Sequence, residues 1–255
     1  MILCERLYEV VGMKGKISLI ASGKGGVGKS SICCFLGDAL ARKGRKVLII
    51  ELDCGLRSLD IMLGVSDKIV FDLSDVLSSR CEASKAIIPC DHNPSLFLLP
   101  ASQNERTDID LSRLMELCRF LSGFYQDILI DMPAGVGVKL QSLSSIADLV
   151  MICVTPDPIS IRDGAKVLSV MGEAVRTSRL LINRVPTNIR SLTMVRDLDE
   201  VIDIVGAQLL GVIPESREYA LCAASGTPLP QTECRAVFDR IAARMTGKHV
   251  PLAFH

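Results

Sequence analysis

The chain has 255 residues, of which 49% are hydrophobic and 23% are charged, so it can bury a full-sized core and is neither disordered nor fibrous. Its 29 basic residues balance its 29 acidic residues, which excludes an overall field that would draw it to nucleic acid or to an anionic membrane. Ten cysteines are spread through apolar segments without a CxxC pair. Neither a signal peptide nor an apolar run of the ~18–20 residues of a membrane span is present. We therefore expect a soluble cytoplasmic protein with reduced thiols.

Short β-rich apolar runs alternate along the chain with longer helical patterns. In chain order, the predicted elements are a strand at 17–21, a helix at 30–43, strands at 47–52 and 96–99, a helix at 109–121, strands at 128–130 and 149–154, a helix at 159–175, and strands at 180–182 and 209–213. This alternation predicts the α/β class, a mostly parallel sheet with helices on both faces. No linker divides it, so we predict one domain at 14–246, with an extension or start-site artefact at 1–13 and a short tail at 247–255.

A glycine-rich loop follows the first predicted strand. Residues 22–31 are Ser-Gly-Lys-Gly-Gly-Val-Gly-Lys-Ser-Ser, which fits GxxxxGK[ST] between a strand and a helix. In such a loop, backbone N–H groups and the helix N-terminus bind phosphates. We expect Lys29 to reach the β- and γ-phosphates and the Ser30 hydroxyl to ligate Mg²⁺. The predicted nucleotide-binding residues of the loop are Gly23, Lys24, Gly25, Gly26, Val27, Gly28, Lys29, Ser30 and Ser31.

Acidic residues follow two other strands. Glu51 and Asp53 lie at the end of the strand at 47–52 and point to the same side of an extended chain, where a carboxylate can orient an attacking water or bind Mg²⁺ through water. Asp131 closes the strand at 128–130, an arrangement in which a carboxylate supports hydrated Mg²⁺. Because ligands bind outside the carboxyl ends of parallel strands, we predict a metal site made by Ser30, Asp53 and Asp131.

A base-binding segment is expected after the strand at 180–182. Guanine-specific phosphate-loop proteins generally carry Asn-Lys-x-Asp, whereas this chain has Asn183-Arg184-Val185-Pro186 with no acidic residue. ATP is therefore favoured over GTP. Asn183 and Arg184 are the polar candidates in this segment, although an asparagine at a strand end is also ordinary turn chemistry.

The segment Lys-Gly-Gly-Val-Gly-Lys-Ser at 24–30 resembles the deviant Walker A motif of the MinD/ParA family of ATPases. The resemblance covers residues 14–246 and includes Asp-Met-Pro-Ala-Gly at 131–135 and Gly-Val-Ile-Pro-Glu at 211–215. It implies a phosphate-loop NTPase fold, ATP and Mg²⁺ as cofactors, and slow hydrolysis in a homodimer that forms with ATP.

The resemblance also implies roles for single residues. In the family the additional lysine, here Lys24, crosses the dimer interface to the partner's nucleotide. The residue matching Asp53 positions the hydrolytic water, and those matching Asn183 and Pro214 contact adenine. The predicted catalytic residues are therefore Lys24, Lys29 and Asp53. Two departures are Glu51, where the family has aspartate, and Ser58, where it has asparagine.

Within the family the motifs are more similar to the MinD branch than to the ParA branch, which implies a role in placing the division septum and partners of the MinC and MinE type. Three alternatives stay open: an FlhG-like regulator of flagellar number, a ParA-like partitioning ATPase, and a nucleotide-gated binding module with negligible turnover. We do not expect nucleic-acid binding, because the arginines near 235–244 are more simply the solvated face of a helix.

The end of the chain departs from the MinD branch, whose members usually finish with a basic amphipathic helix that lies in the membrane. Here Gly247 and Pro251 break any such helix, and the segment before them, with Val237, Ile241 and Met245, is predicted to be a core-facing helix. We expect a cytoplasmic protein that associates with the inner face of the membrane without an evident C-terminal anchor.

Overall fold

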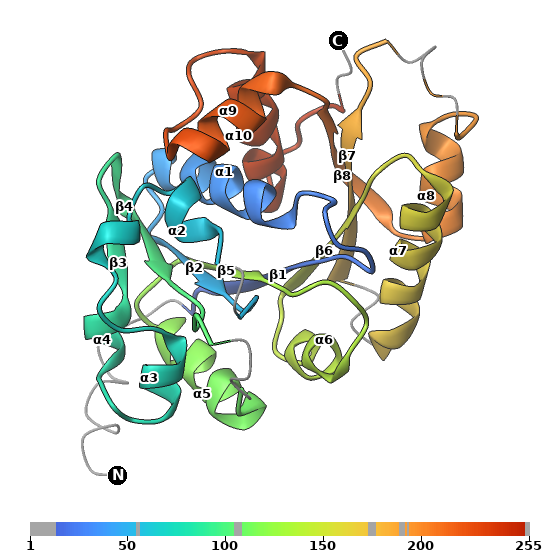
Figure 1. Ribbon diagram of the computed structural model, residues 1–255. Coiled ribbons are helices and arrows are strands. Elements are labelled where there is room, and N and C mark those ends of the chain that lie inside the picture. The colour runs from blue at the N-terminus through green and yellow to red at the C-terminus, as the bar shows by residue number, and fades with distance from the viewer. Residues whose placement is uncertain are drawn as a thin grey trace.

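The computed structural model describes residues 14–54, 57–104, 109–172, 177–188, 192 and 194–252; the predicted extension at 1–13 lies outside them. Within these residues the chain forms an eight-stranded sheet in the order β3-β4-β2-β5-β1-β6-β7-β8 (Figure 1). Its neighbouring strands pair in parallel, except β3 with β4. This confirms the predicted mostly parallel α/β sheet. The strands are β1 (Lys16–Ala21), β2 (Val47–Glu51), β3 (Ile88–Cys90), β4 (Asn93–Leu99), β5 (Asp127–Asp131), β6 (Leu149–Val154), β7 (Ser178–Val185) and β8 (Gln208–Pro214).

Helices cover both faces of the sheet, with α1, α9 and α10 on one side and α5 to α8 on the other (Figure 1). Because successive side chains of a strand point to opposite faces, Leu19 and Ile20 of β1 belong to two different parts of the core. The helices are α1 (Lys29–Arg42), α2 (Leu59–Met62), α3 (Leu73–Leu77), α4 (Ala83–Ala86), α5 (Leu111–Leu121), α6 (Val138–Ser144), α7 (Pro158–Val170), α8 (Leu198–Val205), α9 (Arg217–Ser225) and α10 (Glu233–Met245), with a 3-10 helix η2 (Ser66–Lys68).

The long predicted elements are present, and the differences lie in short ones and at ends. The helix predicted at 159–175 ends at Val170, because Gly172 follows with a φ of +55° that terminates helices. The edge strand β3 was not predicted, since three residues with a central Pro89 carry no strand pattern.

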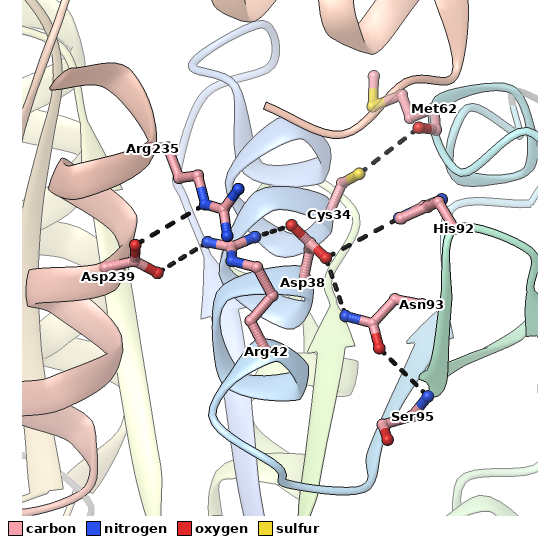
Figure 2. Close-up of polar contacts among 9 residues, drawn as sticks. All are labelled: Cys34, Asp38, Arg42, Met62, His92, Asn93, Ser95, Arg235 and Asp239. Carbon is pink, nitrogen blue, oxygen red and sulfur yellow. Dashed lines mark hydrogen bonds and ion pairs between the residues drawn. The ribbon is translucent and has the colours of Figure 1, made fainter. Parts of the chain in front are cut away.

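A polar network holds α1 in place (Figure 2). Asp38 of α1 pairs with Arg42, which also binds Asp239 of α10 at 2.7 Å. On its other side Asp38 accepts a hydrogen bond of 3.0 Å from the side chain of Asn93, at the start of β4. Cys34 of α1 donates to the carbonyl of Met62 in α2. Because buried charges are stabilised only when paired, this network fixes α1 against three other elements.

The last helix packs into the core as predicted. Val237, Phe238 and Ile241 of α10 are buried against α1, and the helix ends at Met245, before Gly247. The guanidinium of Arg244 donates hydrogen bonds to the carbonyls of residues 210, 250 and 251, so the segment after the helix folds back toward β8. No helix in the described part of the chain combines the length and apolarity that a membrane crossing requires. Every cysteine among the described residues is a free thiol.

Candidate nucleotide-binding site

The phosphate loop connects β1 to α1 at the carboxyl edge of the sheet. The ammonium of Lys29 is buried and donates to the Ser22 hydroxyl at 2.9 Å, and that hydroxyl donates to the carbonyl of Lys24 at 2.7 Å. Gly28 has a φ of +94°, and a Cβ at this position would lie 2.4 Å from the side-chain nitrogen of Asn183. Only glycine therefore fits there, and it allows the loop to approach β7 closely.

Ser30 and Asp131, two of the residues predicted to bind magnesium, contact each other. The Ser30 hydroxyl donates to Oδ2 of Asp131 at 2.6 Å, which brings the first turn of α1 to the end of β5. The other oxygen, Oδ1, is buried and has no hydrogen-bond partner among the described residues. Because Mg²⁺ prefers oxygen ligands, this oxygen and the hydroxyl fit the ion. Among the described residues, no group of three or more His, Cys, Asp or Glu could hold a metal ion without further ligands.

The charge state of Asp131 is unusual. Burial raises its pKa to about 7, and the nearby carboxylates of Glu51 and Asp53 add to this, while the hydrogen bond from Ser30 and the charge of Lys29 act in the opposite direction. The site thus holds a carboxyl group that binds its proton more tightly in the folded than in the unfolded chain. A divalent cation would displace that proton.

The pKa of Asp131 predicts a pH dependence of stability for the protein without nucleotide. Between the unfolded value of 3.8 and about 7 the folded state binds more protons, so stability should fall as pH rises through this window. Relative to an Asp131→Asn variant, which cannot titrate, the wild-type protein should lose on the order of 2–4 kcal/mol between pH 4 and pH 8. Urea denaturation at both pH values measures the difference. A constant difference between the two proteins would contradict the burial of an ionisable group here.

Glu51 and Asp53 do not share one environment, contrary to the prediction that both face the site. Asp53 is half-buried, and its charge acts on Asp131. Glu51 is fully buried and accepts hydrogen bonds from the backbone N–H groups of Ser58 and Leu59 at 2.9 and 3.1 Å. Burial raises the pKa of Glu51, although these backbone hydrogen bonds oppose the shift. Of the two carboxylates, only that of Asp53 is partly exposed.

Lys24 contacts its own subunit. Its Nζ lies 3.7 Å from Oδ1 of Asp157, and 44% of the lysine side chain is exposed. Asp157 caps α7 by accepting from the backbone N–H of Ser160 and also accepts from the Thr155 hydroxyl. Although burial acts to raise it, these hydrogen bonds and the charge of Lys24 lower the pKa of Asp157. The lysine is thus held against the start of α7 by an ion pair that solvent weakens.

A cavity of about 510 Å³ lies beside the phosphate loop and contains the three residues predicted for the base. Asn183 donates to the carbonyl of Val27 at 2.7 Å and accepts from the backbone N–H of Arg184 at 2.9 Å. Within the described parts of the chain, one further hydrogen and one lone pair of the Asn183 amide have no partner, so they could contact a base edge. The predicted base residues that line the cavity are Asn183, Arg184 and Pro214.

Sequence reasoning missed several residues of this region. Asp157 was not predicted as the partner of Lys24, although an aspartate just before Pro158 is a recognisable helix N-cap. The floor of the cavity is an aromatic cluster whose ring centroids lie 5.5 to 5.8 Å apart. The cluster consists of Phe35, Tyr219 and Phe238. No local sequence pattern predicts it, because these residues come from three different helices.

The match to a known family covers most of this structure. Residues 18–229 match the CobQ/CobB/MinD/ParA nucleotide binding domain. The chain belongs to this family. Among its relatives in the CobQ/CobB/MinD/ParA family, the septum site-determining protein MinD of Synechocystis is 33% identical over 242 residues, which cover 92% of this chain and 91% of the relative. MinD of Bacillus subtilis is 30% identical over 245 residues, which cover 93% and 91%.

Solved structures of the CobQ/CobB/MinD/ParA family have the same fold. The MinC:MinD cell division protein complex of Aquifex aeolicus matches with a TM-score of 0.85 and 33% identity, covering 94% of this chain and 98% of that chain. MinD of Pyrococcus horikoshii, complexed with Mg-ADP, matches with a TM-score of 0.80 and 27% identity, covering 91% and 96%. The predicted resemblance to the MinD/ParA ATPases is confirmed.

Proposed function

We propose that this chain is a Mg²⁺-dependent ATPase that switches between a monomer and an ATP-bound homodimer and acts in placing the division septum. The observation that carries the proposal is the meeting of two lysines, a hydroxyl and two carboxylates at one edge of the sheet, supplied by three separate segments. The relatives named septum site-determining proteins, which align over more than 90% of this chain, support the biological role. The residues of this constellation are Lys24, Lys29, Ser30, Asp53 and Asp131.

Each group has a part in phosphoryl transfer. Lys29 and the backbone of the loop bind the phosphates, and Ser30 and Asp131 would hold Mg²⁺. When bound, the ion neutralises charge that develops on the phosphates. Asp53 orients the attacking water, and Lys24 of a second subunit stabilises the transferring phosphoryl group.

If hydrolysis requires a dimer, the ATPase turnover per subunit should depend on protein concentration. Because Lys24 must reach a second subunit, turnover per subunit should rise with concentration through the dimer range and approach a plateau above it. Phosphate release with saturating Mg·ATP over about a 100-fold dilution series, chosen to span dimer dissociation, measures this. Turnover per subunit that stays constant across a range in which sedimentation shows dimers dissociating would contradict the proposal.

A ParA-like role in DNA partitioning has less support. It would need a basic surface, and α10 supplies the arginines. Arg240 is paired with Glu233, Arg235 lies 4.0 Å from Asp239, and Arg244 donates to backbone carbonyls. These guanidinium groups are engaged within the subunit, which leaves little free positive charge for phosphates.

The proposed partners follow from the same relationship. MinD of Aquifex aeolicus has been solved in a complex with MinC, and we propose partners of the MinC and MinE type for this chain. We also propose a cytoplasmic protein whose ATP-bound dimer associates with the inner face of the membrane. Sedimentation with anionic liposomes should then give more pelleted protein with ATP than with ADP. Equal pelleting with both nucleotides would contradict this association.

A further inference from the structure

The inference concerns Glu51, the last residue of β2, and it rests on the proposed ATPase function. Glu51 is 0% exposed and lies opposite Asp131 in the register of β2 and β5. It comes two residues before Asp53 along the chain. A buried carboxylate at this place is costly, so its surroundings must stabilise it.

The partners of Glu51 are backbone N–H groups. Oε1 accepts from Ser58 and Leu59 at 2.9 and 3.1 Å, and Oε2 accepts from Ala101 at 3.4 Å. Ser58 and Leu59 begin α2, where the first N–H groups of a helix have no partner within the helix. The Ser58 side chain makes no capping bond, so Glu51 caps α2 from a neighbouring strand.

Both oxygens of Glu51 are therefore occupied by donors from the backbone. Oδ1 of Asp131, by contrast, is buried without a partner. The chain thus separates the two tasks that a carboxylate can have at this edge. Asp131 keeps an oxygen for the metal, and Glu51 binds the polypeptide.

Asp53 lies between two fixed points. On one side, the N–H of Leu52 donates to the carbonyl of Asp131 at 3.1 Å, which holds the residue before Asp53 to β5. On the other side, Glu51 ties the start of α2 to the end of β2.

The far end of α2 is fixed as well. A Cβ on Gly226 would lie 2.7 Å from the carbonyl oxygen of Ile61 and 2.9 Å from the Cα of Gly64. The backbones of α2 and of the segment after α9 therefore touch. Because both of its ends are held, α2 restrains the position of Asp53 between β2 and α2.

We propose that Glu51 is a positioning residue for ATP hydrolysis: it anchors the start of α2 to the sheet and so holds Asp53 where it can orient the attacking water. This role requires the length of the Glu51 side chain and an acceptor oxygen. It does not require a negative charge that binds Mg²⁺.

Two variants separate this role from that of a magnesium ligand. Glu51→Gln keeps the length and one acceptor oxygen for Ser58 and Leu59, whereas Glu51→Asp keeps the charge but is shorter by one methylene group. The positioning role predicts that kcat stays within about 3-fold of wild type in Glu51→Gln and falls about 10²-fold in Glu51→Asp, the effect of a small displacement of a reacting group. The KM for Mg·ATP and the Mg²⁺ concentration for half-maximal turnover should not change in either variant.

Two further measurements separate the role from a loss of folded protein. Calorimetry with Mg·ADP should give one site per subunit in all three proteins. Hydrogen exchange of the amides at 58 and 59 should be faster in Glu51→Asp than in wild type and Glu51→Gln, because a shorter side chain does not reach them.

The opposite order of the variants overturns the inference. A magnesium ligand would leave Glu51→Asp near wild type and would raise the Mg²⁺ requirement of Glu51→Gln. Equal exchange at residues 58 and 59 in all three proteins would overturn it too. A wild-type protein that binds Mg·ATP without turnover would overturn the proposed function instead, and the exchange measurement would still decide whether Glu51 holds α2.

Discussion

Replacing Lys24 with alanine should abolish ATP hydrolysis and stable dimer formation while leaving nucleotide binding to the single subunit largely intact. In the structure the Lys24 side chain is half-exposed and only loosely paired with Asp157, so it is free to turn toward a second subunit. A cation supplied across an interface to a transferring phosphoryl group is worth about 10³–10⁵ in rate. Phosphate release and sedimentation with ATP measure the two effects.

The matched control is Lys43→Ala. Lys43 is an exposed lysine that follows the other end of α1, at the opposite edge of the sheet, and its loss should leave turnover within about 2-fold of wild type, as for most surface substitutions. A Lys24→Ala protein with the turnover and dimer fraction of the wild type would refute the role across the interface.

Replacing Asp53 with alanine should have an equally large effect of a different kind. Because Asp53 is assigned to the water rather than to the nucleotide, the variant should bind Mg·ATP and dimerise but fail to hydrolyse it. We expect turnover to fall by at least about 10²-fold, the usual contribution of a positioned base or water-orienting group. Sedimentation should show that the ATP-bound dimer persists long after the wild-type dimer has dissociated.

The control for the loss of a negative charge is Asp67→Ala, which removes an exposed carboxylate that has no assigned role in the site. This variant should behave as wild type. If Asp53→Ala instead failed to bind Mg·ATP, Asp53 would belong to the metal site alone. Loss of binding and loss of hydrolysis thus separate the two predicted roles of this carboxylate.

The phosphate loop and Asp131 could be predicted because their signals are local. A strand, a glycine-rich loop and a helix follow one another within 27 residues, and the acidic end of an apolar strand needs no distant information. The sheet could be predicted for the same reason, since its strands alternate with long amphipathic helices.

The remainder depends on contacts between distant segments. Lys24, in the loop after β1, pairs with Asp157, which follows β6, and the aromatic cluster of the cavity joins Phe35 to residues of α9 and α10. The spacing of Glu51 and Asp53 suggested a shared role, but the position at which α2 begins decides which way Glu51 is used. Period and spacing along the chain cannot reveal such a choice.

The anchoring of α1 determines where motion can occur during the ATPase cycle. This helix carries the phosphate loop at one end, and Asp38 and Arg42 attach its other end to α10 and to β4. Because the end of α1 away from the phosphate loop is attached to two other elements, we expect this helix to move little when a phosphate leaves. We therefore expect the segments that follow β2 and β5, rather than α1, to change position when the nucleotide is hydrolysed.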